Sequence, residues 1–171
     1  MSRDVAAAAS WLAVAAVAEE KIGIIGADVG GSIGLKYAAV HAKVALIILL
    51  SPGTHYQEIT TVNAVRFYKN RPILMLYSED DRFASRDAPV LFGFAKMAAG
   101  DRNATLLSVQ KIPGIRLPQN SGVIGQLIDW LKNPVRPETP ASSTPTAPGQ
   151  PEPGAQDNLS PDQESAPDQS R

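Results

Sequence analysis

Short apolar runs alternate with longer segments of helical spacing along most of the chain. The run VALIILL contains no polar position, which is typical of a parallel strand buried on both faces. Strands are predicted at residues 22–25, 44–50, 73–77 and 104–109, and helices at 29–40, 59–68, 88–98 and 122–131. Alternation of this kind predicts an α/β fold with a mostly parallel sheet of about four strands flanked by helices.

Two helices, one at each end of this region, show an apolar face. In the first, after Asp4, the spacing predicts a helix packed on the sheet through Val5, Ala8, Ala9, Leu12 and Ala16. In the last, residues 122–131, the spacing predicts a buried face made of Ile124, Leu127, Ile128 and Leu131.

The Ala-rich stretch at residues 5–18 has a second interpretation. It follows Arg3, and its end, Ala16-Val17-Ala18, resembles a signal-peptidase site. An apolar run of about 14 residues is too short for a membrane span. We expect a cytoplasmic protein, or an exported one if this stretch is a signal peptide.

Proline is concentrated at the C-terminus. Nine of the 14 prolines lie in residues 134–171, which contain no aromatic residue. Such a segment cannot bury enough apolar surface to offset its ordering entropy. The composition therefore predicts a folded domain over residues 1–133 and a disordered, Pro-rich tail over residues 134–171.

Charge and cysteine content narrow the range of partners. The net charge is −1 and the chain has no cysteine, so there is no disulfide and no thiolate metal site. No basic cluster favours binding to nucleic acid. We expect no cofactor and no resident metal.

The glycine-dense sequence KIGIIGADVGGSIG, residues 21–34, carries the main functional signal. A strand, a tight turn and a helix follow one another there, as in a nucleophile elbow of pattern G-x-S-x-G. Gly26 and Gly30 flank the central position, where strand and helix run too close together for a Cβ atom. That central position holds Asp28, not serine.

Together with this elbow, the segments VALIILLSPG, RPILMLYSEDD and IDWLK resemble the C-terminal half of an α/β-hydrolase, close to the bacterial esterase and dienelactone-hydrolase-like group. The resemblance implies a truncated α/β-hydrolase fold that lacks the N-terminal strands. It places Asp28 at the nucleophile position and the oxyanion N–H on Val29. Asp81 matches the acid of the triad, with Asp80 as the near alternative.

The family's histidine loop aligns with residues 112–116, so Ile115 or a neighbour stands where the family has histidine. Related hydrolases of this fold use an elbow aspartate, but they need that histidine to hydrolyse the enzyme ester. The resemblance therefore implies a catalytically impaired homologue, a pseudoenzyme. The alternative is an active hydrolase of esters, lactones or related small substrates that uses Asp28 with a non-standard base.

Further candidates remain open. His55 follows the second strand at the edge where open α/β sheets place their sites, so it is either a replacement base or a loop histidine. Ser32 lies in a literal G-x-S-x-G, but it is expected inside the helix that follows the elbow. His41 is expected at a helix end, exposed to solvent.

Two ligand classes are weighed against this sequence. A divalent metal held by Asp28 with Glu79, Asp80 and Asp81 lacks further oxygen ligands, and a solvated acidic loop is the better interpretation. A dinucleotide fingerprint would need glycine where Asp28 stands.

The truncation implied by the resemblance would leave the strand at residues 22–25 at the edge of its sheet. An exposed apolar edge strand favours pairing with another chain. We therefore expect self-association or a partner chain through this edge, besides a small ester-like substrate.

Overall fold

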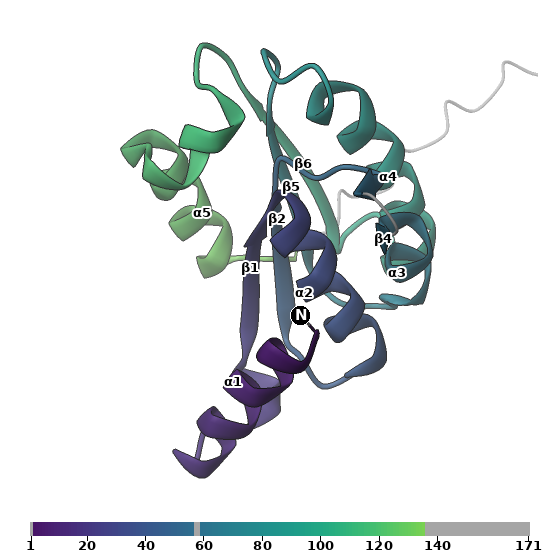
Figure 1. Ribbon diagram of the computed structural model, residues 1–171, viewed down its shortest axis with the longest axis vertical. Coiled ribbons are helices and arrows are strands. Elements are labelled where there is room, and N and C mark those ends of the chain that lie inside the picture. The colour runs from purple at the N-terminus through teal and green to yellow at the C-terminus, as the bar shows by residue number, and fades with distance from the viewer. Residues whose placement is uncertain (1, 57–58, 136–171) are drawn as a thin grey trace, which may run out of the picture. The chain divides into compact units, whose positions relative to one another are not determined.

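A computed structural model describes residues 2–56 and 59–135. Its centre is a parallel sheet of four strands in the order β1 (Gly23–Ala27), β2 (Leu46–Leu50), β5 (Ile73–Ser78) and β6 (Ala104–Val109) (Figure 1). All three strand pairs are parallel. The predicted α/β fold is therefore confirmed. Apart from its first two residues, the tail predicted at residues 134–171 lies outside the described residues.

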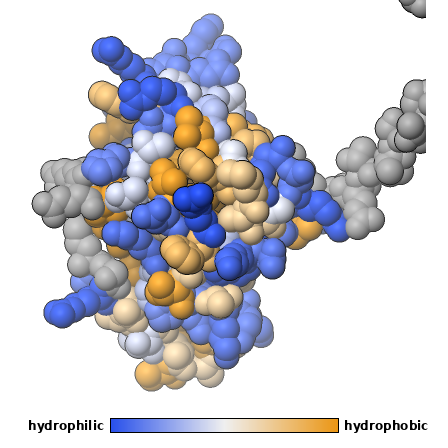
Figure 2. Space-filling view, turned by 90° about the vertical axis from the view of Figure 1, so that its right-hand side faces the viewer, coloured by the Kyte–Doolittle hydropathy of each residue, from blue (hydrophilic) through white to orange (hydrophobic). Residues whose placement is uncertain are grey.

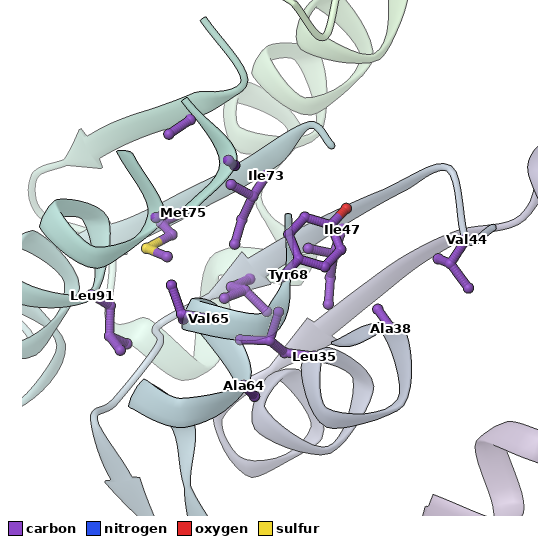
Figure 3. Packing of buried hydrophobic residues seen from close by; sticks show 14 of the residues in the cluster. Leu35, Ala38, Val44, Ile47, Ala64, Val65, Tyr68, Ile73, Met75 and Leu91 are labelled. Atoms are coloured by element: carbon purple, nitrogen blue, oxygen red, sulfur yellow. The ribbon is translucent and has the colours of Figure 1, made fainter. Parts of the chain in front are cut away.

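Helices flank both faces of the sheet. On one face lie α2 (Asp28–Val40), α3 (Thr61–Phe67) and α4 (Ala84–Ala99), and on the other lies α5 (Ser121–Lys132) (Figure 1). Successive strand residues point to opposite faces. Ile47 and Met75 accordingly join the cluster under α2–α4, which Figure 3 shows. Ile48 and Leu76 join the cluster under α5.

The first helix, α1 (Ser2–Val14), does not pack as predicted. Its contacts are mainly with α2. Val5, Ala6 and Ala9 turn toward the core, whereas Ala8 is exposed. Ala6 and Ala9 of α1 line shallow hollows together with Tyr37 of α2 and His41, which follows it.

Helix α5 is rotated relative to the prediction. The buried residues are Val123, Leu127 and Trp130, whereas Ile124 and Ile128 remain more than two-fifths exposed. The indole nitrogen Nε1 of Trp130 donates a buried hydrogen bond to Thr105 Oγ1 at 3.1 Å. Only when this side of α5 faces the sheet is the ring of Trp130 buried and its N–H hydrogen-bonded at the same time.

A short hairpin and two 3-10 helices were not predicted. A two-stranded antiparallel hairpin, β3 (His55–Tyr56) with β4 (Ile59–Thr60), stands between β2 and α3. One 3-10 helix, η2 (Gly114–Gln119), lies between β6 and α5, and the other, η1 (Glu19–Lys21), precedes β1. Both β3 and η2 follow carboxyl ends of strands, so they stand at the edge where the candidate site forms.

The connection between α2 and β2 is held by one arginine. Arg71 donates to three backbone carbonyls: from Nη2 to Ala38 at 2.8 Å, and from Nη1 to His41 and Val44 at 3.0 and 2.9 Å. The guanidinium carbon lies 4.1 Å from the centre of the Tyr68 ring. The bond to Ala38 satisfies a carbonyl in the last turn of α2, which has no partner within the helix, and the other two bonds fix the turn that follows.

The sheet has an open edge at β1, which pairs only with β2 among the described strands. Ile25, in the middle of β1, is 56% exposed. Figure 2 shows the side of the molecule where α3 and α4 lie, on which hydrophobic and hydrophilic surface is interspersed. Within the described residues, no helix is both long and apolar enough to cross a membrane.

Candidate functional site

The elbow has the backbone geometry that the glycine pattern predicts. Asp28 directly follows β1 and is the first residue of α2. Its φ of 47° lies in the left-handed region, which residues other than glycine rarely adopt. A Cβ atom on Gly26 would lie 2.6 Å from both Cα and N of Gly31. One on Gly30 would meet nothing within 4 Å. The close approach expected at Gly30 is therefore made at Gly31.

A pocket of about 490 Å³ lies at the carboxyl ends of the strands, next to this elbow. It brings together three residues singled out from the sequence, Asp28, Asp81 and His55. Its lining also includes residues that the sequence did not indicate, among them Ser51, Tyr56, Phe83, Arg86 and Asp87. Its place agrees with the rule that open α/β sheets bind ligands beyond the carboxyl ends of their strands.

Asp28 is held only weakly. The hydroxyl of Tyr56 donates to the Ser51 carbonyl at 2.9 Å and approaches Asp28 Oδ1 at 3.4 Å. One hydroxyl has a single proton, so the shorter contact takes most of the bond. Partial burial raises the pKa of Asp28, the contact with Tyr56 opposes the rise, and the charge on Asp81 adds to it. The carboxylate is thus available to a ligand.

Tyr56 remains a neutral donor. Burial, followed by the charge of Asp28, raises the pKa of its phenol above the usual range. The residue immediately after the elbow aspartate, Val29, lies in the first turn of α2, where backbone N–H groups have no intrahelical acceptor. Its position is the one that the resemblance implies for an oxyanion donor.

Asp81 has a structural partner on one side and the pocket on the other. Its Oδ1 accepts hydrogen bonds from the backbone N–H groups of Phe83 and Ala84, both at 3.1 Å, at the start of α4. These bonds begin the helix four residues earlier than predicted. Its Oδ2 faces Gly114, where an added Cβ would clash with it and lie 2.7 Å from Ser51 Oγ.

Gly114 is therefore the residue of the final loop that faces the acid. Ile115, which the alignment put at the histidine position, is 79% exposed. The neighbouring acids do not share the pocket: Asp80 Oδ2 accepts from the Lys111 N–H, and Glu79 accepts from Ser108 and Gln110. Of this acidic loop, only Asp81 lines the pocket.

The two histidines of the chain lie in different places. His55 is exposed in β3 at the pocket. His41 follows the end of α2, stacks on Tyr37 with ring centres 3.8 Å apart, and has its Nδ1 3.4 Å from Glu19. It is thus half-buried against a tyrosine and not simply solvated.

Ser32 is not part of this pocket. It is buried in α2, and its hydroxyl shares a hydrogen bond of 2.8 Å with Thr61 Oγ1. The literal G-x-S-x-G around Ser32 therefore contributes a contact between α2 and α3.

Asp87 anchors the loop after β2. Its Oδ2 accepts from both the backbone N–H and the hydroxyl of Thr54, at 2.8 and 2.7 Å, and its Oδ1 accepts from Arg86 Nε at 2.8 Å. Burial alone would raise the pKa of Asp87, but the hydrogen bonds from Arg86 and Thr54 outweigh it and hold the pKa below its usual value. This carboxylate fixes one wall of the pocket.

Metal binding finds no support among the described residues. No three side chains of His, Cys, Asp or Glu in that part of the chain lie close enough to hold a metal ion. The pocket is lined by three carboxylates, of which Asp28 and Asp81 have no basic partner among the described side chains while Asp87 is bound to Arg86, and it is partly lined by aromatic side chains.

Comparison with known proteins adds one likeness. No protein-family profile and no curated protein matches the chain. The crystal structure of the esterase domain of a Rhodothermus marinus protein is similar, with a TM-score of 0.59 and 18% sequence identity over 77% of this chain. The chain spans 66% of the length of that domain. At this identity the likeness shows the fold alone, an esterase-like α/β fold.

Proposed function

We propose that the chain is a hydrolase-fold protein whose pocket binds small molecules without hydrolysing esters. The observation that carries the proposal is Gly114, which faces the carboxylate of Asp81. In a Ser-His-Asp constellation, the acid orients a histidine that removes the proton from the nucleophile. A glycine against Asp81 leaves the acid with no base to orient.

The elbow residue supports the same conclusion. A carboxylate at Asp28 puts negative charge where an ester's oxyanion would develop, next to the N–H of Val29. The charge of Asp81 contributes to raising the pKa of Asp28, so a second negative charge is already felt at this position. Attack on an ester carbonyl would add a third.

A second candidate function is supported by His55, which lines the same pocket as Asp28. In an active hydrolase of esters or lactones, the carboxylate of Asp28 would attack the acyl carbon, the bond to the alkoxide or phenolate leaving group would break, and a mixed anhydride with the protein would form. His55 would then take the proton from the water that hydrolyses that anhydride and restores the Asp28 carboxylate. The left-handed backbone at Asp28, shared with nucleophile elbows, favours this alternative.

Turnover of short p-nitrophenyl esters by the full chain separates the two functions. The variants are Asp28→Ala, Asp28→Ser and His55→Gln, with Asp129→Asn as a control carboxylate exposed on α5. We expect the native chain to match Asp28→Ala and Asp129→Asn at the uncatalysed rate. Turnover that Asp28→Ala and His55→Gln abolish, and Asp129→Asn retains, would overturn the proposal in favour of the active hydrolase.

Binding needs its own measurement. A set of neutral, anionic and cationic fragments is titrated into the isotope-labelled full chain, and the backbone amide signals are followed by NMR. We expect at least one class to shift the signals of Ser51, Tyr56 and Gly114 in a saturable way. If no fragment shifts them, the pocket is not a binding site.

A further inference from the structure

We infer that the pocket recognises a small organic cation, an alkylammonium group held between the carboxylates of Asp28 and Asp81. The inference rests on the proposed binding function, and it names the ligand class. A cation is the ligand whose charge complements this wall of the pocket.

The balance of charge in the lining favours a cation. Three carboxylates, those of Asp28, Asp81 and Asp87, line the pocket with one guanidinium, that of Arg86. Arg86 is already paired with Asp87 at 2.8 Å, and Asp87 also accepts two bonds from Thr54. Two carboxylates therefore remain uncompensated by a basic side chain of the lining, apart from His55, which carries charge only when protonated.

Ser51 provides an independent indication of a ligand. Its side chain is 2% exposed and lines the pocket, yet its Oγ has no hydrogen-bond partner among the described residues. A buried hydroxyl without a partner is rare in folded proteins and requires an explanation. The Oγ atom of Ser51 lies beside Gly114, on the side of Gly114 that faces Asp81. An ammonium group has three donors, enough for both carboxylates and this hydroxyl.

The pocket suits an organic cation better than a metal ion. No three metal-binding side chains of the described residues lie close enough together to hold a bare ion. Tyr56 and Phe83, which also line the pocket, can contact the alkyl part of an amine. The volume of about 490 Å³ falls in the range of small-molecule sites, roughly 300–1,000 Å³.

The test compares three probes of similar size: n-butylammonium chloride, n-butanol and sodium butyrate. Each is titrated into the full chain at pH 7 and constant ionic strength, and binding is read from the NMR signals of Ser51, Tyr56 and Gly114. We expect saturable shifts with butylammonium alone. Asp28→Asn should weaken this binding about tenfold or more, because it removes a charged acceptor, whereas Asp129→Asn should leave it unchanged.

Ser51→Ala separates binding from folding. Because Ser51 Oγ makes no hydrogen bond within the described fold, its removal should leave the melting temperature of the free protein equal or higher. The affinity for butylammonium should nevertheless fall several-fold. A variant with native affinity would overturn the role of Ser51 as an acceptor.

The remaining outcomes are distinct. If butanol or butyrate shifts the pocket signals and butylammonium does not, the cation inference fails while the proposed binding function stands. Equal loss of butylammonium binding in Asp28→Asn and Asp129→Asn would also overturn the inference, because the attraction would then come from general surface charge. If none of these probes or the wider fragment set binds, both proposals fail.

Discussion

The two glycines that flank the elbow aspartate should respond to alanine substitution in opposite directions. Gly26→Ala places a Cβ 2.6 Å from the Cα and N of Gly31, both backbone atoms that cannot rotate away. Gly30→Ala places one in open space, in the first turn of α2. Each variant adds one methyl group to a glycine, so each is the control for the other.

The magnitudes follow from these distances. Ordinary van der Waals contact begins at 3.4 Å, so in Gly26→Ala the strand and the helix would have to separate by about 0.8 Å from the present 2.6 Å. Overpacking of this kind costs about 3 kcal/mol, at the upper end of the usual range because backbone must move. In Gly30→Ala, alanine is the better helix former, and we expect a gain of about 0.5 kcal/mol.

The free energy of unfolding is measured by urea denaturation of the full chain, followed by circular dichroism at 222 nm. A shift of the midpoint at constant slope reports a change in stability and not in the unfolded state. A loss below about 1 kcal/mol in Gly26→Ala would refute the close approach of Gly26 and Gly31. A loss above about 1 kcal/mol in Gly30→Ala would refute the open space at Gly30.

Three further predictions concern the stability of the fold and the free edge of its sheet. Arg71→Ala should lower the free energy of unfolding, measured by urea denaturation, by about 3 kcal/mol, because three carbonyls lose a charged donor. Arg71→Lys should recover only part of this loss. An unchanged free energy of unfolding in Arg71→Ala would contradict the role of Arg71. The pKa of the Asp87 carboxyl is lower in the folded chain than its ordinary value of about 4. The ionised carboxylate therefore stabilises the fold above about pH 4, and this stabilisation is lost as the pH falls through the folded pKa. On acidification, the melting temperature of Asp87→Asn should fall less than that of the native chain. We propose that the free edge of β1 mediates self-association, which Ile25→Lys should weaken in light scattering; a monodisperse native monomer would contradict this.

The strands could be predicted closely because their signal is local. Residues 104–109 form β6 as predicted. The run at 44–50 begins as a strand only at Leu46, because Val44 donates to the His41 carbonyl and accepts from Arg71, which makes it part of the turn after α2. That contact joins residues far apart in the sequence, and no local pattern indicates it.

The site could be predicted only in part, for a similar reason. Asp28, His55 and Asp81 all follow strands, and the carboxyl ends of parallel strands meet at one edge. Tyr56 lies in a two-residue strand, which is too short to show alternation, and Asp87 lies before the predicted start of its helix. Helix α5 is apolar on more than one side, so the bond from Trp130 to Thr105, and not the periodicity, decides which side is buried.

The position of Gly114 indicates which substitutions would complete a catalytic triad on this fold. A Cβ introduced there would clash with Asp81 Oδ2 and lie 2.7 Å from Ser51 Oγ, so the loop must move away from the acid, whose Oδ1 is bonded to the start of α4. With that shift Gly114→His would place an imidazole beside the acid, and Asp28→Ser would supply the hydroxyl at the elbow. Two codon changes therefore separate this chain from a complete set of triad residues, which makes it a compact scaffold for rebuilding hydrolysis step by step.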